Sequence, residues 1–227
     1  MTVPGTFDTS ARELIHAGLQ NLDEARSLFR QLSASGFDAA RCGLLLDALQ
    51  HVCDPDVALR NLVDIVNAQV SQGRALDDIM PDDTAFRQLV AVLGVSDAMG
   101  KLMRFRPDLV QAAATDHCNS HLYNHDQRRA HVLESVGADP NDRMSPTATM
   151  DLADAATALR RTYRNQLAAI IAQDTMSDDP IALQPRISSE LSDLADAALE
   201  GALAIARHEI AGSEHCRFAI IGMGKLG

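Results

Sequence analysis

The final residues, Gly222-Met223-Gly224-Lys225-Leu226-Gly227, have the composition of a loop that grips phosphate. Glycines let backbone N–H groups approach a phosphate closely, and a lysine places a cation beside it. The apolar run from Phe218 to Ile221 precedes them and has the pattern of a buried β-strand. The spacing matches neither GxxxxGK[ST] nor a complete GxGxxG fingerprint, so a tight turn after a strand explains the same residues on local grounds.

A second group of residues has the chemistry of a metal site. His117, His121 and His125 stand four residues apart within DHCNSHLYNHD and would share one face of a helix. Such a face can bind zinc or nickel. The segment has little apolar periodicity, and solvated surface histidines account for the same spacing. We therefore predict no metal site, and keep these three histidines as the alternative.

Four carboxylates, Asp77, Asp78, Asp82 and Asp83, flank Pro81 and have the chemistry of a cation site. A solvated loop followed by acidic residues at a helix start explains them better, because the helix dipole favours acids in its first turn. We assign them no functional role.

Composition narrows the class of protein. The chain has 227 residues, 46% of them hydrophobic, with no Trp, two Tyr and six Phe. This composition favours helices packed through small aliphatic side chains. The formal net charge of −11 opposes binding to nucleic acid or anionic membrane, and from the sequence we expect neither a bilayer span nor a signal peptide. We predict a cytoplasmic protein with no nucleic-acid or membrane partner.

Capping residues predict a series of helices. Ser10 with Glu13 forms a capping-box pattern, Asp38 and Asp54-Pro55 mark two further helix starts, and Gly36 marks a helix end. We predict a helical region over 1–81 and three short helices over 82–114. A polar, histidine-rich linker is expected over 115–147 and two long helices, 147–174 and 188–211, within the region 148–211. The strand and glycine turn of 212–227 would begin another domain.

Four segments carry a resemblance to a known family: LVAVLGVSDAMGKLMRFRPDLV (89–110), ALRRTYRNQLAAIIAQD (158–174), LSDLADAALEGALAIAR (191–207) and RFAIIGMGKLG (217–227). In this order they resemble the bifunctional glutamine synthetase adenylyltransferase and adenylyl-removing enzymes, particularly the actinobacterial form. The resemblance runs from about Asp82 to Gly227, interrupted by the histidine-rich stretch. Residues before Asp82 match only in being helical.

The resemblance implies a mainly α fold, a helical bundle that leads into the first β-strand of a truncated DNA polymerase beta-type nucleotidyltransferase domain. Gly224 and Lys225 match the family's turn that binds nucleotide phosphates. An SDxD-type carboxylate pair, which would hold Mg²⁺, is expected beyond Gly227. The position of the segments near the chain start implies the first nucleotidyltransferase half, which is associated with removing AMP.

The implied function is an enzyme of nitrogen regulation. The intact protein would use Mg²⁺ and ATP to transfer AMP to a tyrosine of glutamine synthetase, and would remove it by phosphorolysis, giving ADP. We expect the 227-residue chain to be an inactive N-terminal part that binds no cofactor tightly. The alternative is a non-catalytic helical docking module for glutamine synthetase or for the nitrogen-signalling regulatory protein, a further candidate partner.

Overall fold

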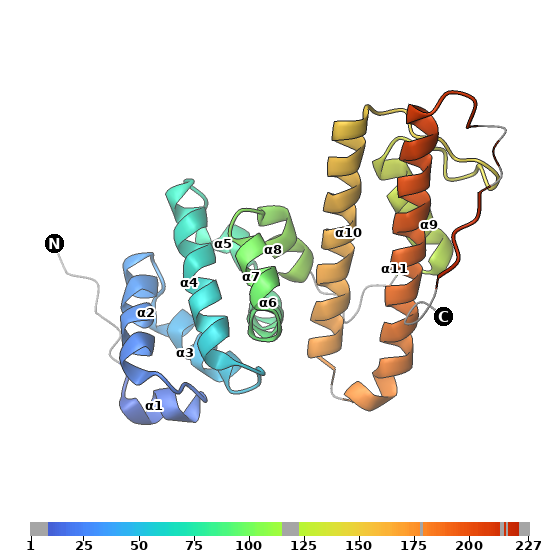
Figure 1. Ribbon diagram of the computed structural model, residues 1–227. Helices are drawn as coiled ribbons and strands as arrows, with labels where there is room; N and C mark the ends of the chain where they lie inside the picture. Colours follow the sequence, from blue (N-terminus) through green and yellow to red (C-terminus); the bar gives the residue numbers. More distant parts are fainter. Residues whose placement is uncertain (1–8, 115–122, 178, 214–215, 217, 223–227) are drawn as a thin grey trace. The chain divides into compact units, whose positions relative to one another are not determined.

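The computed structural model describes residues 9–114, 123–177, 179–213, 216 and 218–222, with the backbone alone described at 78 and 79. Helices dominate these residues, which contain no β-strand (Figure 1). The chain divides into two compact units, and the predicted mainly helical fold is confirmed. Unit 1 comprises residues 1–118 and 171–176, and unit 2 comprises residues 119–170 and 177–227.

Unit 1 is built from short and medium helices connected by tight turns. They are α1 (Ala11–His16), α2 (Leu22–Ala34), α3 (Ala39–Leu49), α4 (Pro55–Ser71), α5 (Leu76–Ile79), α6 (Asp83–Val95), α7 (Asp97–Met103) and α8 (Pro107–Ala114). The three short helices predicted between 82 and 114 are therefore confirmed as α6, α7 and α8.

Side chains at the helix ends explain where these helices begin and stop. Ser10 and Glu13 form the predicted capping box, in which the Ser10 N–H donates to Glu13 Oε2 at 2.9 Å and the Glu13 N–H donates to Ser10 Oγ at 3.3 Å. Asp38 and Asp54 accept from the third amides of α3 and α4 at 2.8 and 2.9 Å. Gly36 follows α2 at φ +104°, a left-handed conformation that favours glycine.

The core of unit 1 lies around α4 and α6. Both helices carry leucines that are fully buried, namely Leu59 and Leu62 on α4 and Leu89 and Leu93 on α6. Helix α7 comes so close to α4 that a Cβ added at Gly100 would lie 2.8 Å from Asn61 Cβ. The glycine thus sets the distance between the two helices.

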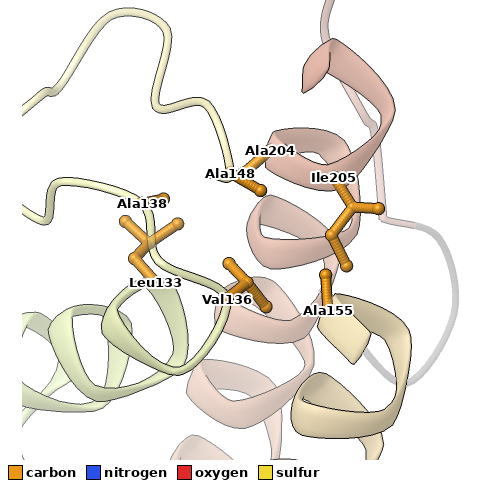
Figure 2. Close-up of a cluster of buried hydrophobic side chains, with 7 residues drawn as sticks. All are labelled: Leu133, Val136, Ala138, Ala148, Ala155, Ala204 and Ile205. Atoms are coloured by element: carbon orange, nitrogen blue, oxygen red, sulfur yellow. The ribbon is translucent and has the colours of Figure 1, made fainter. Parts of the chain in front are cut away.

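Unit 2 contains α9 (His125–Ser135), residues 152–170 of α10 (Leu152–Thr175), and α11 (Pro180–Glu209). Two apolar clusters connect the helices. The cluster in Figure 2 joins α9, the connection after it, α10 and α11 through Leu133, Val136, Ala138, Ala148, Ala155, Ala204 and Ile205. The other joins α10 and α11 through Ile170, Ile187 and Leu194, with Leu167 and Leu183 packed against it.

Two expectations on helices differ from the structure. The polar stretch 115–147, predicted as a linker, contains α9, whose Val132 and Leu133 are buried. The polar sequence indicated exposure to solvent, but the two arginines of α9 are buried against carboxylates of α11. Helix α11 begins at Pro180 and not near Ser188, because Asp179 caps it and Pro185 is accommodated inside it.

The strand predicted from Phe218 to Ile221 is not formed in the described residues that follow α11. Residues 218–222 are irregular, and Phe218, Ile220 and Ile221 are 62%, 46% and 83% exposed. A strand requires a neighbouring strand to satisfy its backbone N–H and C=O groups. No partner strand exists among the residues that the structure describes.

Candidate functional site

The segment that leaves α11, residues 210–222, leads to the predicted phosphate-binding turn, and we call it the exit segment. Its first residues fold back on the helix. The Ile210 N–H donates to Ala206 O at 3.1 Å, and Ser213 Oγ donates to Arg207 O at 2.8 Å. Gly212 lies at φ +80° between them, and the Cys216 N–H donates to Ser213 O at 2.9 Å. The start of the exit segment therefore has a defined direction.

An apolar pocket of about 420 Å³ lies between the last turns of α11 and the exit segment. Among the described residues that line it, only Arg207 is charged, and its Nη1 donates to Pro146 O at 3.2 Å. These lining residues can accept apolar groups and include no set of metal ligands. The pocket is lined by Leu203, Ala206, Arg207, Ile210, Ala211, Gly212, Ser213, Cys216 and Phe218.

The connection between α9 and α10, residues 136–151, is fastened to α11 by Arg129. Two guanidinium nitrogens, Nε and Nη2, donate to the carboxylate of Glu200 at 2.7 and 2.6 Å. Nη1 and Nη2 also donate to the carbonyls of Pro140 and Asp142 at 2.6 and 2.8 Å. The Arg129 side chain is 8% exposed, so this clamp is largely removed from solvent.

Asp142 adds a turn to the same connection. Its Oδ1 accepts from the amides of Met144 and Ser145 at 2.8 and 2.9 Å. These bonds, that from Ser145 first, hold the pKa of the half-buried Asp142 carboxyl below its ordinary value, and the positive charges of Arg207 and Arg129 act in the same direction.

Similarity to known proteins covers the exit segment and the helices before it. A family model described as Glutamate-ammonia ligase adenylyltransferase matches residues 86–227. The chain belongs to this family. The resemblance expected from the four sequence segments is confirmed.

Relatives extend the similarity over almost the whole chain. A bifunctional glutamine synthetase adenylyltransferase/adenylyl-removing enzyme from Bifidobacterium longum is 66% identical over 221 residues, 97% of this chain and 20% of the relative. Proteins of the same name from Leifsonia xyli and Cutibacterium acnes are 32% and 29% identical, over 94% and 95% of this chain. Residues before Asp82, which we expected to match the family only in being helical, therefore share its sequence as well.

The chain spans about a fifth of the length of these relatives. No solved structure matches it significantly. None of the helices in the described residues combines the length and apolar character needed to cross a bilayer.

The turn predicted to bind phosphate follows the exit segment in the sequence. Gly224 and Lys225 lie outside the described residues, which stop at Gly222. Their assignment as phosphate-binding residues therefore stays a prediction from the sequence.

Of the three histidines of the alternative metal site, the described residues include only His125. His117 and His121 lie outside the described residues, and His125 is the first residue of α9, after non-helical residues 123 and 124. His125 Nδ1 lies 3.0 Å from Asp193 Oδ1 on α11. Among the residues described, no group of three or more His, Cys, Asp or Glu side chains is arranged to hold a metal ion.

The acidic cluster around Pro81 has structural roles where its side chains are described. Asp82 caps α6 by accepting from the Ala85 N–H at 2.8 Å, and Asp83 lies in the first turn of that helix. Asp77 pairs with Arg41. These contacts agree with the interpretation as helix-start acids.

Sequence reasoning missed a buried polar cluster in which each helix of unit 2 supplies one residue. Arg128 of α9, 1% exposed, donates to Gln166 Oε1 of α10 at 2.7 Å and pairs with Glu190 of α11. The ring of Tyr123 lies 5.9 Å from the guanidinium carbon. No local sequence pattern predicts this cluster, because the partners of Arg128 lie 38 and 62 residues away in the chain.

Proposed function

We propose that this chain is the N-terminal helical region, and the beginning of the first nucleotidyltransferase domain, of an enzyme that adenylylates and deadenylylates glutamine synthetase. The observation that carries the proposal is the 66% identity over 97% of the chain to relatives with that name. The family match also continues through residue 227, so it includes the glycine turn.

The reactions that we propose for the intact protein are transfer and removal of AMP. In transfer, a tyrosine oxygen of glutamine synthetase attacks the α-phosphorus of ATP, loses its proton, and pyrophosphate leaves. In removal, an oxygen of inorganic phosphate bonds to the phosphorus of the AMP group. The bond from that phosphorus to the tyrosine oxygen breaks, the tyrosine oxygen takes up a proton, and ADP leaves.

Gly224 and Lys225 are the residues of this chain that we propose to contact phosphate. Backbone N–H groups at a glycine turn point toward an anion without interference from a Cβ, and the lysine ammonium adds a mobile positive charge. Both contacts stabilise negative charge on the transferring group and require no proton transfer from the protein.

Mg²⁺ would neutralise phosphate charge in the intact enzyme, and it prefers carboxylate and water oxygens as ligands. Among the described residues, no three or more His, Cys, Asp or Glu side chains gather in a group that could hold an ion. We therefore derive no step through the metal here. We propose that its ligands lie outside these 227 residues and that the chain alone does not transfer AMP.

Glutamine synthetase is the proposed partner, with the nitrogen-signalling regulatory protein as a further one, and the proposed location is the cytoplasm. The formal charge of −11 is compatible with a protein partner and unfavourable for nucleic acid. A helical docking module without catalysis would use the same surfaces, so activity has to separate the two functions.

The test compares the 227-residue chain with a polypeptide extended by about 100 residues, the size of a typical domain. Both are assayed for Mg²⁺-dependent release of ADP from adenylylated glutamine synthetase and phosphate. Activity in the longer polypeptide alone supports the proposal. Activity in the short chain would contradict the assignment of the metal ligands. Binding of glutamine synthetase by both without activity in either would favour the docking module.

A further inference from the structure

The 136–151 connection is long and irregular but strongly fixed. Connections of more than about 12–15 residues without secondary structure are uncommon in compact domains, and they usually have a function. This one contains two local turns, in which Asp139 accepts from the Asn141 N–H at 2.9 Å and Asp142 accepts from the amides that follow it. Its contacts with the rest of unit 2 show what it holds in place.

Arg129 fastens the first half of the connection. Its guanidinium binds both carboxylate oxygens of Glu200 and, on the other side, the carbonyls of Pro140 and Asp142. Only arginine offers a planar set of donors that can serve a carboxylate and two carbonyls at once. The connection is thereby tied to α11 at Glu200, before the last turns of that helix.

The second half of the connection binds the last turns of α11. The Ala148 N–H donates to Ala204 O at 3.0 Å, and Arg207 Nη1 donates to Pro146 O at 3.2 Å. Arg207 O in turn accepts from Ser213 Oγ in the exit segment, as described above. Hydrogen bonds thus tie both halves of the connection to α11, and the same last turns of α11 hold the start of the exit segment.

We propose that Arg129 is a positioning residue, which holds the 136–151 connection on the end of α11 and so fixes the direction in which the chain leaves that helix before Gly224 and Lys225. The inference rests on the proposed function, because it assumes that Gly224 and Lys225 contact phosphate. Arg129 itself touches no substrate in this arrangement. A displacement of about 1 Å at a reacting group can cost about 100-fold in rate. Loosening the Arg129 clamp is therefore expected to lower kcat/KM for phosphate.

The neighbouring arginines provide contrasts. Among the described residues, Arg128 contacts side chains of α10 and α11 and the ring of Tyr123, none of which belongs to the 136–151 connection, so its loss affects helix packing without releasing the connection. Arg143 lies within the connection but is 63% exposed and pairs with the exposed Asp126. A change at Arg143 therefore alters the charge of the same connection and leaves the clamp intact, which makes it the matched control.

The experiment uses the full-length polypeptide that carries this chain, with Arg129→Gln, Arg129→Lys and the control Arg143→Gln. ADP release from adenylylated glutamine synthetase is measured against phosphate concentration. AMP transfer to unmodified glutamine synthetase and thermal unfolding are measured on the same samples. For Arg129→Gln we expect kcat/KM for phosphate to fall about 10- to 100-fold. Arg129→Lys keeps the charge and recovers part of the loss, and Arg143→Gln stays within about twofold of the parent.

The decisive result is a loss of ADP release by Arg129→Gln without a loss of AMP transfer. AMP transfer is expected to stay within about twofold of the parent, because the resemblance assigns it to the other half of the enzyme. Unchanged phosphate dependence in Arg129→Gln overturns the inference. A parallel loss of both activities with a lowered unfolding midpoint also overturns it, because Arg129 would then act only on stability. Absence of ADP release by the parent polypeptide would instead refute the proposed function.

Discussion

Replacing Gly100 by alanine tests the closest helix contact in unit 1. In an unhindered helix interior this change is stabilising by about 0.5–1 kcal/mol, because alanine loses less backbone entropy than glycine. At Gly100 the new Cβ would meet the Cγ, Nδ2 and Cβ atoms of Asn61, the last at 2.8 Å. Asn61 Cβ is attached directly to the backbone of α4, so rotation of the side chain cannot relieve the whole clash.

Two costs oppose the gain in helix propensity. Overpacking of a close contact costs about 1–3 kcal/mol. Asn61 is 5% exposed and donates from Nδ2 to Leu93 O at 3.4 Å, and loss of that bond leaves a buried amide at a cost of about 1–3 kcal/mol. We expect Gly100→Ala to lower the free energy of unfolding of unit 1 by about 2 kcal/mol.

Gly43 in α3 is the matched control, because nothing lies within 4 Å of a Cβ added there. Gly43→Ala is expected to stabilise unit 1 by about 0.5–1 kcal/mol. Hydrogen exchange followed by mass spectrometry on peptides from α4 and α7 reports the opening free energy of unit 1 separately from unit 2. Equal stabilisation by both substitutions would refute the close approach of α7 to α4. In an Asn61→Ala background, the cost of Gly100→Ala should shrink.

Three further predictions concern single side chains. Glu190→Ala leaves the Arg128 guanidinium buried without its carboxylate, and should destabilise unit 2 by about 3–5 kcal/mol in urea unfolding. Asp54→Ala removes the cap of α4 and should cost unit 1 about 1 kcal/mol by hydrogen exchange of α4. The pKa of Asp142 is lowered from 3.8 by the Ser145 and Met144 amides, so its stabilisation is present above pH 3.8 and disappears as the pH falls through the folded-state pKa. Asp142→Asn should therefore show a smaller loss of protection in 136–151 below pH 3.8 than the parent.

Local signals in the sequence predicted most of unit 1. Ser10, Asp38 and Asp54 cap their helices through bonds to amides three residues later, so a short window of sequence contains both partners. The division of 82–114 into three helices was predicted for the same reason, because Ser96 and Pro107 mark the boundaries between neighbouring helices.

Distant partners explain what the sequence did not predict in unit 2. The segment of α9 was predicted as a linker because it is polar, and its Arg128 and Arg129 are of a type usually found at the surface. The carboxylates that bind these arginines lie on α11, 62 and 71 residues later. The observed start of α11 at Pro180 precedes the predicted start at Ser188, because Asp179 caps the helix and Pro185 lies inside it. The candidate phosphate turn was predicted from its glycine and lysine residues and from resemblance. The contacts of Arg129 were not predicted, because backbone carbonyls are common to all residues and give no signal in residue types.

The ion pair between Arg129 and Glu200 also sets an order of events during protein synthesis. Helix α9 has 11 residues, which is too short to be stable in water by itself, and it acquires its carboxylate partner only after another 71 residues have been added. At roughly 5–20 residues per second this takes about 4–14 s. Residues 125–135 therefore leave the ribosome with two arginines that lack their buried partners on α11, after residues 1–118 of unit 1 have already been synthesised. A nascent chain that pauses before Glu200 would display this segment to chaperones and proteases.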